Sequence, residues 1–136
     1  MGTSFTKLNR DWNAEPNAPD PKAIVDGADV VLEFLANPFQ FRQFADGDVL
    51  KLRFLDAVRF RLGATNDEGW DRGQCRFSST APAWGEFYEV AGDLKLGSVM
   101  DWVLVNDSAT GSMRHFLFYF RDDTFECTAA DWRLEQ

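Results

Sequence analysis

The residues best suited to chemistry are carboxylates near tryptophans, and the first group lies in the stretch NDEGWDRGQC, residues 66–75. Asp67, Glu68 and Asp71 surround Trp70 there, and carboxylates clustered in one loop are what a calcium ion prefers. The spacing does not fit a calcium loop, because Trp70 takes the place of an expected oxygen ligand. The turn-forming residues instead indicate a surface connection between strands. If Trp70 is exposed beside Asp71, this loop is a candidate surface for a binding partner.

The second acidic group is WGEFYE, residues 84–89, which combines Trp84 with Glu86 and Glu89. Two carboxyl groups at a defined separation, one of them with a raised pKa, hydrolyse glycosidic bonds in many enzymes. The sequence defines neither the separation nor the pKa. A carboxylate-based hydrolase is therefore our third hypothesis, and we regard Trp84 and Glu86 as candidate binding residues.

Catalysis by a nucleophile and a base usually depends on histidine, and the chain has only His115. In an alternating strand His115 shares a face with Tyr119, and Glu126 follows nearby, so a small polar cluster can be drawn. No nucleophile motif, metalloprotease motif or phosphate-binding loop accompanies it. We therefore expect a histidine with a local hydrogen bond at a strand end, no catalytic residue, and a protein that is not an enzyme.

The two cysteines, Cys75 and Cys127, are too few and too far apart for a zinc site. We expect no metal and no cofactor. Each cysteine shares strand parity with phenylalanines, which indicates small core residues rather than reactive thiols. The sequence leaves open whether the two form a disulfide, which would be unusual in a cytosolic protein.

Basic residues alternate with apolar residues along the stretch 50–62 and just before it, so in an extended strand the two kinds would lie on opposite faces. The stripe consists of Arg42, Lys51, Arg53, Arg59 and Arg61. Because guanidinium groups bind anions well, Arg53, Arg59 and Arg61 are candidate anion-binding residues. The alternative is a solvated outer face whose charges pair with neighbours such as Glu33.

The formal net charge of -8 and the sequence pI near 4.5 weigh against binding to nucleic acid. Binding to phosphate backbones depends on Lys and Arg, so we expect no nucleic acid partner. A basic protein would be attracted by the same charge. The chain has no apolar run of membrane-spanning length and no apolar leader, so we expect no membrane association and a cytoplasmic location.

Residues 1–19 read as an extended N-terminal arm before a single domain at 20–136, because Pro16 and Pro19 restrict the backbone there. Trp12 lies in this arm among polar neighbours. It either docks onto the domain as an anchor or is offered to a partner, for which tryptophan is favoured.

From residue 28 onward, apolar and polar residues alternate with period 2, which predicts β-strands. The clearest case is LKLRFLDAVRFRL, residues 50–62, which predicts one long strand bent near Asp56. Asp46-Gly47 before it favours a two-residue hairpin turn. That turn would place Phe41 opposite Leu52 and pair this strand with residues 39–44.

A second hairpin is predicted from HFLFYFRDDTFECTA with Asp122-Asp123 as its turn, which would place Phe118 opposite Cys127. Both parities of the stretch 115–120 are largely apolar, so this strand should be covered on both faces. We expect the arm with Trp12 or the C-terminal segment with Trp132 to supply the second cover.

Further short strands are predicted at residues 74–78, 85–90 and 98–105, and short helices are plausible at 20–27 and near the C-terminus from Thr128. About eight antiparallel strands with short connections indicate an all-β sandwich or barrel with at most one or two short helices.

An acidic, aromatic-rich β domain without a catalytic constellation fits a protein whose work is binding. Our leading hypothesis is a non-catalytic protein-binding module for a partner that could be basic, such as an immunity-type or regulatory protein, by analogy of size and charge alone. The alternative is a β-barrel or sandwich that holds a small apolar or anionic ligand in a Phe-lined cavity. The sequence leaves the oligomeric state open, a homodimer included.

Overall fold

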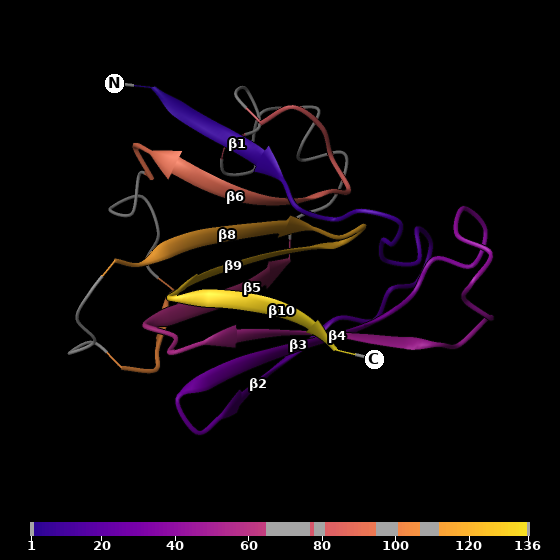
Figure 1. The fold of residues 1–136 in the computed structure, drawn as a ribbon, viewed down its shortest axis with the longest axis horizontal. Coiled ribbons are helices and arrows are strands. Elements are labelled where there is room, and N and C mark those ends of the chain that lie inside the picture. Colours follow the sequence, from indigo (N-terminus) through magenta and orange to yellow (C-terminus); the bar gives the residue numbers. More distant parts are fainter. Residues whose placement is uncertain (1, 65–76, 78–80, 95–100, 107–111, 136) are drawn as a thin grey trace.

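The computed structural model of the chain describes residues 2–64, 77, 81–94, 101–106 and 112–135. Within these ranges ten strands form two antiparallel sheets, and no helix is present (Figure 1). The strands are β1 Thr3–Lys7, β2 Lys22–Asp26, β3 Asp29–Leu35, β4 Val49–Leu55, β5 Arg59–Ala64, β6 Phe87–Gly92, β7 Val103–Leu104, β8 Arg114–Tyr119, β9 Asp123–Ala129 and β10 Asp131–Glu135. In this part of the chain no helix has the length and apolar character needed to cross a bilayer.

The two sheets are layered as a sandwich rather than closed into a barrel. One sheet has the strand order β1-β6-β8-β9-β5-β7, and the other has the order β10-β4-β3-β2. Each described sheet therefore ends in two edge strands, whereas a closed barrel would have none. The expected all-β antiparallel architecture is confirmed, and the sandwich is the form it takes.

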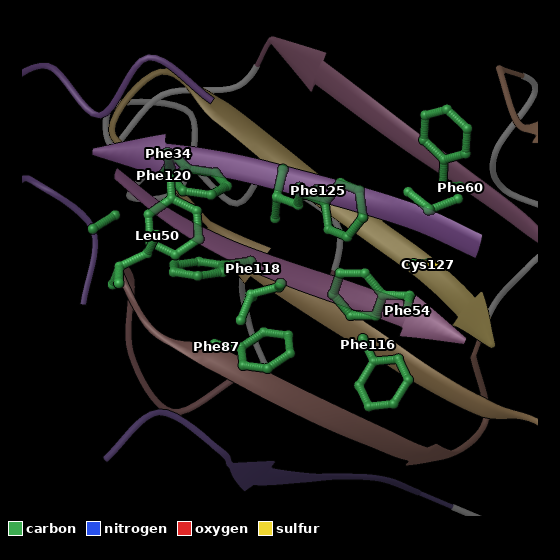
Figure 2. Packing of buried hydrophobic residues seen from close by; sticks show 14 of the residues in the cluster. Phe34, Leu50, Phe54, Phe60, Phe87, Phe116, Phe118, Phe120, Phe125 and Cys127 are labelled. Atoms are coloured by element: carbon green, nitrogen blue, oxygen red, sulfur yellow. The ribbon is translucent and has the colours of Figure 1, made fainter. Parts of the chain in front are cut away.

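The core between the sheets is built from the inward parity of each strand, where phenylalanine rings meet in a continuous cluster (Figure 2). Phe118 and Phe120 stack at 4.3 Å between ring centroids, and Phe54 lies 5.3 Å from Phe116. Such offset and edge contacts add to the stabilisation from apolar burial. Cys127 is a free, buried thiol in this cluster, and burial raises its pKa.

The predicted long strand at 50–62 is bent at Asp56, as expected, but its two halves belong to different sheets. β4 lies in the four-stranded sheet and β5 in the six-stranded sheet. Asp56 has a φ of 49°, a left-handed conformation that Asp tolerates better than most residues. Its backbone N–H donates to Oδ1 of Asp29 at 3.0 Å, which anchors the corner.

The first predicted hairpin is wrong. Both sides of β4 are occupied by other strands, so that Leu52 faces Leu32 on β3 and Leu134 on β10. Residues 37–48 form turns and loops. Gly47 has a φ of 90°, but Asp46 does not adopt the positive φ that a type I′ turn needs at both positions. Pairing with two distant strands overrode the local turn signal.

The second predicted hairpin is formed by β8 and β9, with a register two residues away from the prediction. Phe118 faces Phe125, and the N–H of Phe120 donates to the carbonyl of Asp123 at 2.8 Å. The turn therefore contains Arg121 and Asp122. Because side chains alternate with period 2, a shift of two residues leaves every residue on its predicted face.

Both predicted helices are wrong, since residues 22–26 form β2 and residues 131–135 form β10. Gly27, with a φ of 62°, lies in the turn that joins β2 to β3. Strand pairing outweighs the weak helix signals of these short segments.

Of the other predicted strands, the stretch 85–90 is confirmed from Phe87 onward as part of β6, and the stretch 98–105 contains the short β7. The stretch 74–78 lies outside the described residues except for Phe77, which is in a turn with a φ of 64°.

β8 is covered on both faces, as predicted, but not by the predicted tryptophans. Leu117 and Tyr119 on its outer face pack with Phe77 and, from the N-terminal strand, Phe5. Trp12 and Trp132 lie in the main core on the other face. The cover therefore comes from Phe5 on β1, which belongs to the predicted N-terminal arm, and from Phe77 before β6.

Candidate functional site

A groove made of two clefts hollows one end of the sandwich. Two adjoining clefts, of about 480 and 550 Å³, share Asn13, Gln40 and Glu86 in their linings. We call the two clefts together the end groove. Its lining residues discussed below are Lys7, Asn9, Trp12, Asn13, Asn37, Gln40, Trp84, Gly85, Glu86, Tyr119 and Arg121.

Trp12 lines one of the two clefts of the end groove and is only 5% exposed. Its ring centroid lies 6.0 Å from Phe34, 6.1 Å from Phe87 and 6.2 Å from Phe118. These contacts involve both sheets, so Trp12 fastens the segment that passes from β1 to β2 across the end of the sandwich. Trp12 therefore acts as an anchor and presents little surface to a partner.

Asn9 and Glu86 form the polar centre of one wall. Asn9 is 4% exposed, and its Nδ2 donates to Oε2 of Glu86 at 2.7 Å and to the carbonyl of Trp12 at 3.2 Å. Its Oδ1 accepts the N–H of Phe87 at 3.1 Å. Nζ of Lys7 lies 3.4 Å from the same Glu86 oxygen. These bonds fix the Glu86 carboxylate at the groove while its side chain stays 25% exposed.

Asn13 and Asn37 hold the opposite parts of the groove together through the backbone. Nδ2 of Asn13 donates to the carbonyl of Gly85 at 2.8 Å, and the Asn13 carbonyl accepts the N–H of Asn37 at 3.0 Å. Oδ1 of Asn37 accepts the N–H groups of Phe39 and Gln40 at 3.0 and 3.2 Å. Three distant segments are thus joined by bonds of the protein itself, so the groove is largely preformed.

Aromatic residues lie in the lining of the groove and next to it in the sequence. Trp84, half-buried, stacks on the buried Tyr119 with 4.8 Å between ring centroids. Phe39, next to the lining residue Gln40, is 73% exposed, the highest exposure among the large apolar residues described. Arg121 completes the rim, and its guanidinium donates to the carbonyl of Asn17 at 3.4 Å.

The carboxylates Glu86 and Glu89 have separate partners and do not form a facing pair. Glu89 binds Arg114, with Oε1 and Oε2 at 2.7 and 3.0 Å from the guanidinium nitrogens. The hydrogen bonds and charge of Glu89, together with the charge of Asp131, raise the pKa of Arg114. Glu89 is therefore engaged in an ion pair with Arg114, and Glu86 and Glu89 do not form the acid pair that a glycosidase uses.

His115 has the local hydrogen bonds that the sequence predicts, in a buried network. Its Nδ1 lies 2.9 Å from Oγ1 of Thr128, and its Nε2 lies 2.8 Å from Oε1 of Glu126. Arg61 lies 3.5 Å from the other Glu126 oxygen. The exposed fraction of His115 is 2%, which leaves almost no surface for a substrate.

The three candidate anion-binding arginines are not brought together. Arg53 is on the outer face of the four-stranded sheet, whereas Arg59 and Arg61 are on β5 in the other sheet. Arg59 lies over the ring of Trp102, 5.6 Å from its centroid. Arg61 donates to Asp101 at 2.9 Å.

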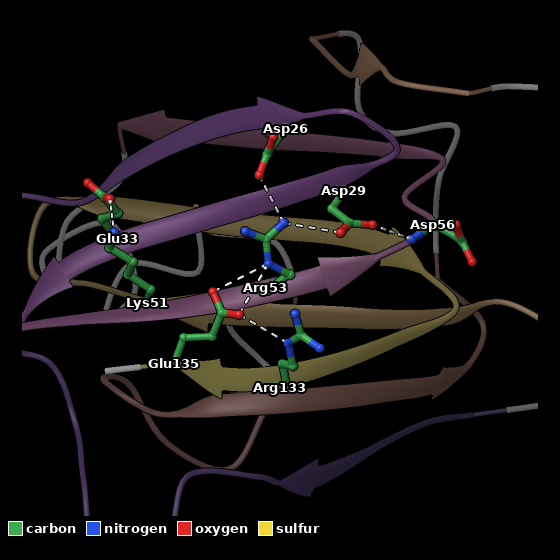
Figure 3. A network of polar contacts seen from close by, with 8 residues as sticks. All are labelled: Asp26, Asp29, Glu33, Lys51, Arg53, Asp56, Arg133 and Glu135. Atoms are coloured by element: carbon green, nitrogen blue, oxygen red, sulfur yellow. Dashed lines mark hydrogen bonds and ion pairs between the residues drawn. The ribbon is translucent and has the colours of Figure 1, made fainter.

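Arg53 is surrounded by the carboxylates of Asp26, Asp29 and Glu135 at 3.1 to 3.3 Å (Figure 3). The hydrogen bonds that Arg53 donates to Asp26 and then to Asp29 are the main causes that raise its pKa. Lys51 pairs with Glu33 at 3.2 Å on the same face. These pairings match the alternative of a solvated outer face better than an anion site.

The predicted loop residues Asp67, Glu68, Trp70 and Asp71 lie outside the described residues, as does Cys75. Within the described ranges no group of three or more His, Cys, Asp or Glu side chains is arranged to hold a metal ion.

Of the predicted binding residues, Trp12, Trp84 and Glu86 come together at the end groove. The sequence reasoning missed Asn9, Asn13 and Gln40, although the concentration of asparagines around Trp12 was a visible signal. Comparisons of the chain with known protein families, with curated proteins and with solved structures found no match.

Proposed function

We propose that this protein is a non-catalytic protein-binding module and that the end groove receives an exposed segment of its partner. The observation that carries the proposal is the preformed groove itself, whose lining combines the amides of Asn13 and Gln40 with the aromatic surface of Trp84. The exposed ring of Phe39 follows next to Gln40 in the sequence. Aromatic side chains are enriched in protein interfaces and are typical anchors where a partner buries them. A groove fixed by its own hydrogen bonds loses little conformational freedom on binding.

The charge of the groove indicates what kind of segment would fit. Oε2 of Glu86 is held by Asn9 and Lys7, while Oε1 has no hydrogen-bond partner among the described residues. A partially buried carboxylate with one open oxygen suits a Lys or Arg side chain. The formal net charge of -8 would also speed the approach of a basic partner. We therefore expect a segment with one cationic and one apolar side chain.

The small-ligand alternative has less support from the geometry. The phenylalanines that suggested a lined cavity are in mutual contact in the core, with ring centroids as close as 4.3 Å. The clefts of the end groove have the volume of small-molecule sites, but their linings are rich in polar side chains. Native mass spectrometry of the purified protein would show a retained small molecule if that alternative holds.

A cytoplasmic location and the absence of nucleic acid and membrane partners are part of the same proposal. The buried, unpaired thiol of Cys127 is compatible with a reducing compartment. The acidic composition supports a protein partner over a nucleic acid.

The test begins with chemical cross-linking in the source cells and affinity capture, followed by calorimetry on the purified pair. Glu86→Gln keeps an acceptor for Asn9 but removes the charge, and we expect at least about tenfold weaker binding. Phe39→Ala, at an exposed position, should weaken binding by a similar factor. Asp46→Asn, an equal charge change in an exposed loop, is the matched control and should leave the affinity unchanged.

Two results would contradict the proposal. One is a purified partner that binds the Glu86→Gln and Phe39→Ala variants as tightly as the unchanged protein. The other is an affinity that does not fall as the salt concentration rises, which would remove the electrostatic part of the argument.

A further inference from the structure

The strand β2, with the sequence KAIVD, forms an outer edge of the four-stranded sheet in the part of the chain that the structure describes. It is the last strand of the four-stranded sheet among the described residues, and β3 pairs with one side of it only (Figure 1). Ile24 and Val25 are 49% and 48% exposed. Natural edge strands are usually protected by proline, by a bulge or by a charge in the middle of the strand. β2 has its charges only at its two ends.

The backbone direction along β2 follows from its hairpin with β3. Asp26 faces Asp29 across a two-residue turn, so this pair is hydrogen-bonded and the pairs then alternate. Lys22, Ile24 and Asp26 therefore direct their backbone groups toward β3. Ala23 and Val25 direct their N–H and C=O groups to the open edge.

β2 is complementary to itself when two copies are placed antiparallel about Ile24. Ala23 then faces Val25 of the second copy, and these edge-directed residues form hydrogen-bonded pairs, as the alternation requires. Ile24 faces Ile24 across the two-fold axis. Lys22 faces Asp26 of the second copy at both ends, so each end of the paired strands carries opposite charges.

The other edge of the same sheet lacks this property. Antiparallel pairing of β10 about Arg133 would place Asp131 opposite Glu135 of the second copy and Arg133 opposite itself. Like charges directly opposite each other destabilise a strand pair. The distribution of charge thus favours β2 over β10 as a self-pairing edge.

We propose that two copies of this chain associate through their β2 strands, which join the two four-stranded sheets into one continuous sheet across a two-fold axis. A two-fold interface of this kind uses the same surface on both copies, as closed dimers do. The proposal concerns β2 alone and is independent of the end groove.

The main test is a charge exchange followed by sedimentation across a concentration series. Lys22→Glu places Glu opposite Asp26, and Asp26→Lys places Lys opposite Lys22, so each variant alone should dissociate at least about tenfold more readily. An equimolar mixture of the two variants restores opposite charges at both ends and should form a mixed dimer. Arg42→Glu, the same charge change at an exposed loop position, should leave the dimer intact.

A second test does not depend on Asp26, which also contacts Arg53. Val25→Pro removes an edge-directed N–H without removing a bond to β3, and should also abolish association. Ile24→Cys should form a disulfide between copies under mild oxidation, because opposed Cα atoms of a pair without hydrogen bonds lie about 4.5 Å apart. Val49→Cys, at a similarly exposed apolar residue on β4, should not.

Three results would overturn the proposal. The first is that the unchanged protein stays monomeric up to about 1 mM, far above the range of specific dimers. The second is that a dimer persists in the Lys22→Glu and Val25→Pro variants. The third is that the mixture of the two charge variants does not associate, although circular dichroism shows that each variant is folded.

Discussion

Nε2 of His115 lies 2.8 Å from Oε1 of Glu126, and both side chains are buried on the outer face of the six-stranded sheet. The two residues are on the paired strands β8 and β9. Thr128 on one side and Arg61 on the other extend the contact into a network. The network ties β5, β8 and β9 together through side chains as well as through the backbone.

Glu126→Ala should be among the most destabilising substitutions in the protein. It removes the buried carboxylate that Nε2 of His115 and the guanidinium of Arg61 contact, and the loss of one partner of a buried ion pair typically costs about 3 to 5 kcal/mol. Glu126→Gln retains an acceptor and should cost less, so the two variants should be clearly separated in urea unfolding. Equal stability of the alanine variant and the unchanged protein would show that the network contributes nothing.

Phe118→Ala and Phe39→Ala should have very different effects on stability, although they remove the same side chain. Phe118 is fully buried against Phe34, Phe87 and Phe120, so its loss should cost about 3 to 5 kcal/mol. Phe39 is 73% exposed, and its loss should change stability by about 0.5 kcal/mol or less. Thermal and denaturant unfolding of the two variants measures the difference. A large loss from Phe39→Ala would mean that this ring is a structural contact.

The corner at Asp56 should tolerate glycine but not a β-branched residue. Asp56 has a φ of 49°, and its side chain is exposed, so its conformation matters more than its chemistry. Asp56→Val should cost about 1 to 2 kcal/mol, while Asp56→Gly should be close to neutral. Asp46→Val, at a loop residue without a positive φ, is the control and should cost less than Asp56→Val. Equal costs for the two valine variants would argue against strain at the corner.

Asp123 and Asp101 should affect stability in opposite directions as the pH changes. Burial, together with the charge of Asp122, raises the pKa of Asp123 above its ordinary value of 3.8. The contribution of the protonated Asp123 side chain to the stability of the folded protein is therefore fully present below that value. It is lost as the pH rises through the raised pKa. Asp123→Asn should raise the melting temperature at pH 7 and have little effect near about pH 3.

For Asp101, the hydrogen bond from Arg61 lowers the pKa below 3.8. The ionised Asp101 therefore stabilises the folded protein above the ordinary pKa, and this stabilisation is lost as the pH falls through the lowered pKa. Asp101→Asn should therefore lower the melting temperature at pH 7, with a difference that shrinks in acid. The same sign of change for Asp101→Asn and Asp123→Asn at pH 7 would contradict these assignments.

Much of the side-chain placement within strands could be predicted from the alternation of apolar and polar residues. In β4, Leu50, Leu52 and Phe54 are buried and Lys51 is exposed, as their parity indicates. The second hairpin kept its faces even though its register moved by two residues. Alternation is reliable because a strand with one buried face must place every second side chain in the core.

The partners of the strands could not be predicted with the same success. Asp46-Gly47 is a strong local turn signal, yet β3 and β10 pair with β4 in place of residues 39–44. The segments from Lys22 and from Asp131 carried weak helix signals but became edge strands. Backbone hydrogen bonds to a neighbouring strand form only in the folded sheet, so local propensity does not reveal them.

The end groove shows the same division between local and tertiary information. Its aromatic and acidic members, Trp84 and Glu86, were recognisable as candidates by residue type, as was Trp12. The contact between Asn9 and Glu86 joins positions 77 residues apart, and no spacing rule connects them.

The sequence by itself determined the β class, the buried parity of the strands and the acidic character of the surface, because these follow from local sterics and hydrophobicity. Only the tertiary structure decided which strands pair, where the chain turns between sheets and which polar side chains meet, because those contacts depend on segments that are brought together by folding.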